Sequence, residues 1–239
     1  MITLQKLGKS FQGRPVVRGL SFEATDGAIT GLLGVNGAGK TTTLRMICGV
    51  LKPESGSIRI DCDTDTTGSA QRHVGALLDH IGLYSRLTVR ENLEYFGRLR
   101  GMPARDLTRR IDHVISVLGL ESIADRLTAG FSQGERMKTA LGRALLHGPK
   151  NLLLDEPTNG LDILTVRSLR DLLKRLRDEG TCVIFSSHVL DEVRALCDRI
   201  VVISHGKIAG QGSAAELCAQ AGTSSLEDAF VQLTGAGEA

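Results

Sequence analysis

The stretch "GVNGAGKT", Gly34 to Thr41, fits the pattern G-x-x-x-x-G-K-[ST], which is typical of loops that bind phosphate groups. It follows the apolar run 28–33, which predicts a buried strand, and it precedes a helical pattern over 39–50. In such a strand–loop–helix unit, glycines let backbone N–H groups face phosphate oxygens, and the helix N-terminus adds partial positive charge. The stretch therefore predicts a nucleotide-binding α/β core, with a ligand-free glycine turn as the alternative.

The residues of this loop have different expected roles. Lys40 is placed to reach the β- and γ-phosphates, and the Thr41 hydroxyl is placed to ligate Mg²⁺. The loop thus predicts that a nucleoside triphosphate binds together with Mg²⁺. The predicted nucleotide-binding residues of this segment are Gly34, Val35, Asn36, Gly37, Ala38, Gly39, Lys40, Thr41 and Thr42.

Two adjacent carboxylates follow a second apolar run in "NLLLDEPTNGLD", residues 151–162. The run itself predicts a buried strand, and Asp155 and Glu156 stand at its carboxyl end. Carboxylates in that place are costly unless they are paired or bind a metal ion. We therefore expect Asp155 to hold the Mg²⁺ shell and Glu156 to polarise the attacking water. The alternative is an exposed acidic loop.

A histidine follows a third apolar run, "TCVIFSS", residues 181–187. A single histidine is more often structural than catalytic. However, Gly34, Asp155 and His188 all come directly after predicted parallel strands, and ligands bind outside the carboxyl ends of the strands in such sheets. We therefore expect His188 to contact the γ-phosphate or the water. The predicted catalytic residues are Glu156, His188 and Lys40.

The remaining pattern places these motifs in one domain with an insertion. Alternating apolar and polar residues over 2–6 and 16–25 predict an N-terminal antiparallel β subdomain. Strand and helix alternate after residue 147, which predicts a parallel sheet with right-handed crossovers. We therefore predict a single α/β domain over 1–239. Its parts are a core of 1–87 and 148–212, an inserted helical subdomain of 88–147, and a short helical tail of 213–239.

Composition excludes several classes of protein. Of the 239 residues, 41% are hydrophobic and 23% are charged, which predicts a packed core rather than disorder. The net charge is +2 and aromatic residues make up 3%, so nothing calls for a nucleic-acid partner. The five cysteines form no CxxC pair, which argues against a zinc site and a disulfide framework. The sequence shows no secretory signal and no apolar run long enough to span a membrane.

Five motifs in a fixed order carry a family resemblance: "GVNGAGKT", "FSQGERMK", "LLLDEP", "GLD" and "SSH". With them, essentially the whole chain resembles the ATP-binding subunit of an ATP-binding-cassette (ABC) transporter, whose core is that of a P-loop NTPase. The resemblance implies an ATPase that forms ADP and phosphate from ATP and water. It also implies a homodimer that powers a separately encoded membrane permease from the cytoplasmic face of the membrane.

The resemblance assigns further residues. Phe11 matches the aromatic residue that stacks on adenine, with a core phenylalanine as the alternative. The segment "FSQGERMK", residues 131–138, contains a capping box of Ser132 and Glu135, which predicts a helix start. It also resembles the family's signature segment, which faces the γ-phosphate bound by the opposite subunit. The predicted residues of the signature and the dimer contact are Ser132, Gln133, Gly134, Glu135 and Asp162.

The chain departs from the family pattern in two motifs. The signature usually reads Leu-Ser-Gly-Gly-Gln, and here it reads Phe131-Ser132-Gln133-Gly134-Glu135, which keeps the serine and the second glycine. The family also has a glutamine after the strand predicted over 74–78, where this chain has Asp79. An ionised aspartate cannot donate a hydrogen bond, but it can bind Mg²⁺ through water. This departure bears on the coupling to the permease.

Three functional alternatives follow from the sequence. The stretch "DHIGLYSRLTVRENLEYFGRL" and the tail "SLEDAFVQLTG" resemble ATP-binding subunits that serve separately encoded exporters. Within that group, the ATP-binding subunits of the sodium-efflux type are the most similar. The alternatives are an ABC-2-type exporter of a drug, lipid or polysaccharide, and a nucleotide-sensing regulator with little turnover.

The segment 86–110 carries seven arginines, which favour a solvated helix face over a docking surface.

Overall fold

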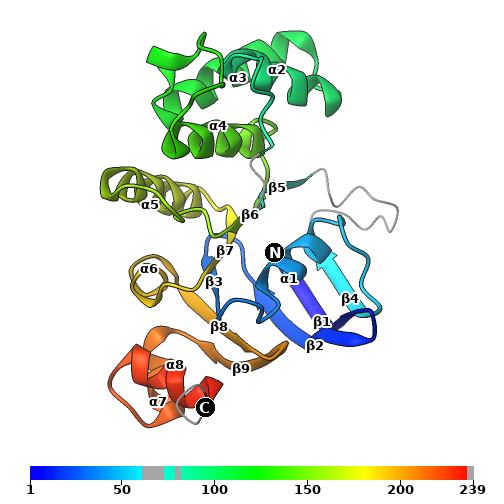
Figure 1. Cartoon of the computed structure of the whole chain (residues 1–239), viewed down its shortest axis with the longest axis vertical. Helices are drawn as coiled ribbons and strands as arrows, with labels where there is room; N and C mark the ends of the chain where they lie inside the picture. Colours follow the sequence, from blue (N-terminus) through cyan, green and yellow to red (C-terminus); the bar gives the residue numbers. More distant parts are fainter. Residues whose placement is uncertain (61–72, 79–81, 236–239) are drawn as a thin grey trace.

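The computed structural model describes residues 1–60, 73–78 and 82–235, so Asp79 lies outside the described residues. The strands of the described part form two sheets (Figure 1). An antiparallel sheet has the order β2-β1-β4, and the central sheet has the order β5-β6-β7-β3-β8-β9. The first comprises β1 (Ile2–Phe11), β2 (Arg14–Ala24) and β4 (Ser55–Ile60). The second comprises β3 (Ile29–Leu33), β5 (Val74–Leu77), β6 (Asn151–Asp155), β7 (Cys182–Ser187), β8 (Arg199–Ser204) and β9 (Lys207–Gly212).

The central sheet is buried on both faces. Strands β5, β6, β7, β3 and β8 pair in parallel, as the alternation of strands and helices predicts. Successive residues of a strand point to opposite faces, so each strand contributes to two separate cores. In β7, for example, Val183 and Phe185 belong to one hydrophobic cluster and Ile184 belongs to the other. Burial on both faces explains why these strands read as continuous apolar runs.

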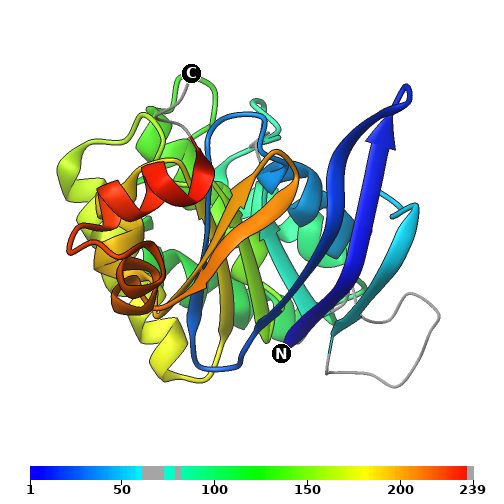
Figure 2. The ribbon, with the colours of Figure 1, turned by 90° about the horizontal axis from the view of Figure 1, so that it is seen from below.

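Helices and the antiparallel sheet cover the two faces. On one face, α1 (Lys40–Ile47) lies between the central sheet and the antiparallel sheet, and Leu44 and Ile47 pack into the core between them (Figure 2). The opposite face is covered by α5 (Ile163–Asp178) and α6 (Leu190–Leu196). The C-terminal helices α7 (Ala214–Ala221) and α8 (Leu226–Thr234) pack beside β8 and β9.

The helical segment after β5 lies at one end of the molecule (Figure 1). It contains α2 (Val89–Leu99), α3 (Ala104–Leu118), a 3₁₀ turn η2 (Glu121–Ile123) and α4 (Gln133–Leu145). The capping box predicted at Ser132 is present, and Thr88 forms a second one with Glu91 at the start of α2. The helical pattern of the sequence is thus confirmed, whereas the division of the chain into core, subdomain and tail stays our prediction.

Sequence patterning was wrong at some element bounds and missed one strand. The first strand continues from the predicted end at residue 6 to Phe11, and β2 begins at Arg14 rather than at residue 16. The missed strand, β9, reads KIAGQG and pairs antiparallel with β8. Two glycines and a single β-branched residue give this segment little strand propensity. It forms a strand because it pairs with the free edge of β8.

The arginine-rich segment is largely a solvated face with local ion pairs, as predicted. Arg98 pairs with Glu94, and the Arg109 guanidinium lies 2.9 Å from Asp106. Arg110 differs, because it donates hydrogen bonds to two backbone oxygens at the end of α4, those of Leu145 (3.1 Å) and Leu146 (3.0 Å). It therefore caps a helix C-terminus. In the part of the chain that the structure describes, no helix is long and apolar enough to cross a membrane.

Candidate functional site

The loop between β3 and α1 is tightly packed and leaves the helix N-terminus open. A Cβ at Gly34 would lie 2.4 Å from the backbone oxygen of Ile203 in β8, so this position has no room for a side chain. Gly39 has φ 109° and precedes α1, which has no side-chain cap and no acidic residue in its first turn. The first N–H groups of a helix need partners, and here no side chain supplies one. An anion such as a phosphate fits that end.

Lys40 lies inside this loop. Its ammonium group donates hydrogen bonds to the backbone oxygens of Gly34 (2.7 Å) and Val35 (3.3 Å). It also lies 3.5 Å from Oε1 of Glu156, and the lysine is 4% exposed. A buried ammonium needs paired partners, and the loop carbonyls and the carboxylate provide them. The predicted loop cation and the predicted catalytic carboxylate are thus brought together.

Two adjoining clefts are lined by nine of the predicted residues. A cleft of about 130 Å³ is lined by the loop and by Glu156, and a second cleft, of about 340 Å³, continues past Thr41 to the carboxyl end of β6. The smaller cleft is lined by Val16, Asn36, Gly37, Gly39, Lys40, Thr41, Thr42 and Glu156. The larger cleft includes Thr41, Gln133, Asp155, Glu156 and Asn159.

Asp155 fits the predicted role of a metal ligand. Its Oδ1 accepts a hydrogen bond from the Ser186 hydroxyl, whereas Oδ2 is buried and has no hydrogen-bond partner among the described residues. A buried carboxylate oxygen without a partner is costly unless a cation satisfies it. The Thr41 hydroxyl and this carboxylate line the same cleft. Oxygen ligands of this kind suit Mg²⁺.

Glu156 has a strained backbone that two hydrogen bonds hold in place. Its φ is 45°, in the left-handed region that costs a residue with a side chain about 1–2 kcal/mol. Its N–H donates to both the backbone oxygen (3.2 Å) and the hydroxyl (3.0 Å) of Ser186. The carboxylate consequently turns toward Lys40 and His188. Nδ1 of His188 lies 3.2 Å from Oε2 of Glu156, so the structure also brings the predicted histidine to this carboxylate.

Two further residues at this site escaped the sequence analysis. The amide of Asn159 donates a hydrogen bond of 3.4 Å to the Glu156 carboxylate. Ser186 is fully buried, and its single hydroxyl accepts from the Glu156 N–H and donates to Asp155. The only available signal was the pair of serines before His188. Small polar residues at the end of an apolar strand indicate that a polar neighbour needs a partner there.

Ser186→Ala is expected to lower turnover about 10-fold and the free energy of unfolding by about 1–2 kcal/mol. The substitution leaves Asp155 without its hydroxyl donor and removes one of the two acceptors that hold the strained Glu156 backbone. Steady-state ATPase assays and urea unfolding measure the two effects. Ser168→Ala removes an exposed hydroxyl that donates within α5 and should change neither quantity. Unchanged turnover in Ser186→Ala contradicts the role assigned here.

The predicted signature segment begins α4. Ser132 is the N-cap, and its hydroxyl accepts from the Glu135 N–H (3.2 Å) while the Glu135 carboxylate accepts from the Ser132 N–H (2.8 Å). The second of these bonds is the main reason why the pKa of Glu135 is lowered. The amide of Gln133 donates to the backbone oxygen of Asn159 at 2.6 Å. The signature helix therefore contacts the loop after Glu156 within the same chain.

The other two predicted residues have clear local environments. Asp162 is exposed and is the N-cap of α5, where its carboxylate accepts from the N–H (2.9 Å) and hydroxyl (2.6 Å) of Thr165. These bonds lower the pKa of Asp162, with the hydroxyl the larger cause. The Phe11 ring is 45% exposed and stands outside both cores, so the alternative of a core phenylalanine is wrong.

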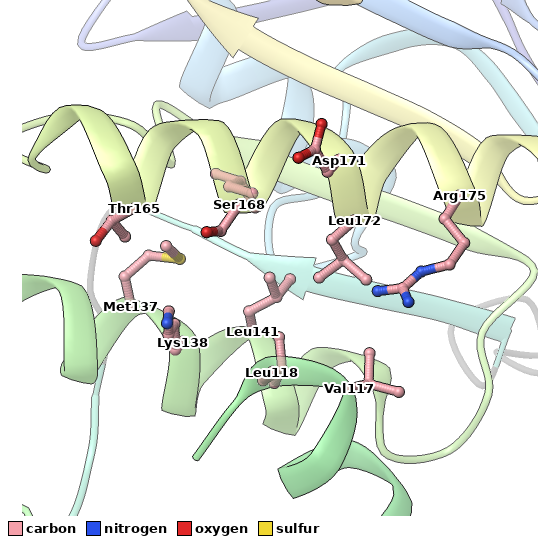
Figure 3. Close-up of a pocket in the computed structure, with 11 residues that line it drawn as sticks. Val117, Leu118, Met137, Lys138, Leu141, Thr165, Ser168, Asp171, Leu172 and Arg175 are labelled. Atoms are coloured by element: carbon pink, nitrogen blue, oxygen red, sulfur yellow. The ribbon is translucent and has the colours of Figure 1, made fainter.

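Another cleft, of about 360 Å³, lies away from these residues (Figure 3). It is the seam between α4 and α5, with Leu141 and Leu172 inside it and Lys138 and Arg175 at its sides. It contains none of the predicted nucleotide-binding side chains. We place the chemistry at the smaller clefts because the loop, the carboxylates and the histidine converge there. Met137 lines both this seam and the cleft at Asp155.

Comparison with known proteins gives one consistent family. ABC transporter ATP-binding protein NatA of Bacillus subtilis (strain 168) is 40% identical over 221 residues, which cover 89% of each chain. Linearmycin resistance ATP-binding protein LnrL of the same organism is 34% identical over 239 residues, covering 99% of this chain and 76% of the relative.

Solved structures agree with this result. An ATP-binding subunit of an ABC transporter superposes with a TM-score of 0.89 at 27% identity, covering 98% of this chain and 99% of the other. The dimeric ATP-binding cassette MJ0796, bound to ADP and phosphate, superposes with a TM-score of 0.79 at 25% identity, covering 89% and 98%. Residues 17–159 match the profile of the ABC transporter family. The chain therefore belongs to the ABC transporter family, as one of its ATP-binding, ATP-hydrolysing proteins.

Proposed function

We propose that this chain is the motor subunit of an exporter, in which two copies bind Mg-ATP between them and drive a separately encoded permease. The observation that carries the proposal is the position of the Glu156 carboxylate, which lies 3.5 Å from the Lys40 ammonium and 3.2 Å from Nδ1 of His188. A carboxylate between a phosphate-binding cation and a histidine is suited to activating water for phosphoryl transfer.

Each residue has a role in the proposed reaction. The open N-terminus of α1 and Lys40 hold the β- and γ-phosphates. Glu156 accepts a proton from the attacking water, and His188 orients the carboxylate and contacts the γ-phosphate. Asp155 and the Thr41 hydroxyl would hold Mg²⁺, which when bound neutralises charge on the phosphate oxygens. Phe11, exposed at the end of β1, supplies a face for the adenine ring.

The proposed dimer places the signature segment of each chain at the ATP bound by the other. Large apolar side chains are exposed next to the motifs, which supports this arrangement. Ile163 is 85% exposed and Leu164 is 75% exposed, and both follow Asp162 directly. Val35 in the phosphate loop and Val189 after His188 are also exposed. The similar cassette MJ0796 is dimeric in its solved structure.

A permease partner and a place at the cytoplasmic face of the membrane are part of the same proposal. The name of the relative LnrL refers to resistance to linearmycin, which suits export. A further structural relative, cbiO1 from Clostridium perfringens, is described as part of an ABC transporter complex. The sodium-efflux type that the sequence resembles makes Na⁺ the first substrate to test, and a drug or lipid the second.

The proposal is tested with the chain purified from its native membrane. We expect a polytopic membrane protein to co-purify and to stimulate ATP hydrolysis. Vesicles containing the complex are then assayed for ATP-dependent movement of Na⁺. An active complex that moves no Na⁺ rejects sodium while leaving the exporter motor intact. Slow hydrolysis that no membrane protein stimulates supports the nucleotide-sensing regulator instead.

A further inference from the structure

A carboxylate outside all five motifs joins two loops of the proposed catalytic site. Glu192 lies on α6, and its Oε2 accepts hydrogen bonds from the hydroxyls of Thr158 (2.7 Å) and Ser187 (3.0 Å). Thr158 belongs to the loop that follows β6 and carries Glu156, and Ser187 ends β7 directly before His188. Thr158 and Ser187 are 8% and 2% exposed. One oxygen atom of Glu192 thus connects the segment that carries Glu156 to the segment that carries His188.

The direction of these hydrogen bonds explains why a carboxylate occupies the position. The Ser187 hydroxyl already accepts from the N–H of Val189 (3.0 Å), so its proton needs an acceptor. Thr158 presents a second hydroxyl proton to the same point. An ionised carboxylate only accepts hydrogen bonds, so it satisfies both donors without competing for either. Bonds to a charged acceptor are also stronger than bonds between neutral groups.

The two serines before His188 form hydrogen bonds with different partners. Ser186 contacts Asp155 and the backbone of Glu156, whereas Ser187 contacts Glu192. Asp155 and Ser186 are also partners in the pairing of β6 with β7, so the two loops leave the sheet side by side. Ser186 fixes where the loops begin, and Glu192 joins them one to three residues further on.

We propose that Glu192 is a positioning residue that holds the His188 loop against the Glu156 loop, and thereby sets the contact of 3.2 Å between Nδ1 of His188 and the Glu156 carboxylate. The inference rests on the proposed roles of Glu156 and His188. The observed hydrogen bonds of Glu192 do not involve the phosphate loop or the signature segment. Its effect is therefore on the hydrolytic step rather than on ATP binding. Small displacements of aligned reacting groups are costly in rate.

The test is a steady-state ATPase comparison of substituted chains. In Glu192→Ala we expect kcat to fall about 10-fold while the KM for ATP stays within about 2-fold of the wild-type value. Glu192→Gln retains an oxygen that accepts from both hydroxyls and should keep most of the activity. Asp191→Ala is the matched control, because this neighbouring acid is exposed and pairs only with Arg194, at 2.9 Å, in the observed contacts. It should leave kcat unchanged.

A double-mutant cycle separates positioning from general destabilisation. If Glu192 acts through His188, adding Glu192→Ala to His188→Ala should lower kcat by less than about 3-fold. Full additivity of the two losses overturns the inference, as does a lowered melting temperature with wild-type kcat. Thr158→Val removes the second hydroxyl and carries the same test if Glu192→Ala does not give folded protein.

Parallel assays of Glu156→Gln keep this inference distinct from the proposed function. If Glu156→Gln keeps wild-type turnover, the catalytic roles proposed above fail. If Glu156→Gln stops turnover while both Glu192→Ala and Thr158→Val hydrolyse ATP at the wild-type rate, only the positioning role of Glu192 fails.

Discussion

Glu156→Gln is expected to lower ATP turnover on the order of 1,000-fold while ATP still binds. A glutamine amide cannot accept a proton from water, and loss of a general base costs about 100- to 10,000-fold in rate. The phosphate-binding groups remain, because Lys40 keeps its hydrogen bonds to the loop oxygens of Gly34 and Val35. Turnover is measured as released phosphate, and ATP affinity is measured by calorimetry at equilibrium.

The same variant should trap the ATP-bound dimer. When hydrolysis stops, ATP stays between the two chains, so size-exclusion chromatography should show a dimer with ATP and a monomer without it. Glu179→Gln changes an exposed carboxylate at the far end of α5 and serves as the control, with wild-type turnover. Wild-type turnover in Glu156→Gln itself would falsify the role of Glu156.

Lys40→Ala is expected to weaken ATP binding about 100-fold. The ammonium group is the cation of the loop nearest to the open N-terminus of α1, and charge-assisted hydrogen bonds to phosphate contribute about 1.5–3 kcal/mol each. Its removal also leaves Glu156 without the cation 3.5 Å away, and this carboxylate then repels the γ-phosphate. Equilibrium titration with ATP measures the dissociation constant.

The loss in Lys40→Ala should appear in affinity rather than only in rate. Lys52→Ala, which removes an exposed lysine shortly after α1, should bind ATP like the wild type. If Lys40→Ala binds ATP normally and only turnover falls, then the helix N-terminus holds the phosphates without the lysine. The assignment of Lys40 to nucleotide binding is wrong in that case.

Local chemistry made much of the site predictable. The phosphate loop, the capping boxes at Thr88 and Ser132, and the carboxylates at the end of β6 depend on residues close together in the chain. The parallel strands were predictable because burial on both faces demands continuous apolar runs. The order of the strands follows from pairing, not from local pattern, and β3 lies between β7 and β8 although it comes first in the chain.

The structure confirms the predicted capping role of Glu135. Its carboxylate occupies the N–H of Ser132 and lies 3.5 Å from the Arg126 guanidinium. A negative charge thereby stays at the start of α4, whereas α1 has no acidic residue in its first turn. A negative charge near a helix N-terminus is favourable, but it competes with a bound anion. The two helix starts therefore differ in how freely they can take up phosphate.

The sequence by itself determined the family and the phosphate loop and predicted the side chains of the proposed reaction, because these depend on short patterns of neighbouring residues. Only the tertiary structure decided how those side chains are held. Ser186 meets Asp155 across 31 residues, and Thr158 meets Glu192 across 34. Such hydrogen bonds have no local period, and they form only where the sheet brings the ends of two strands together.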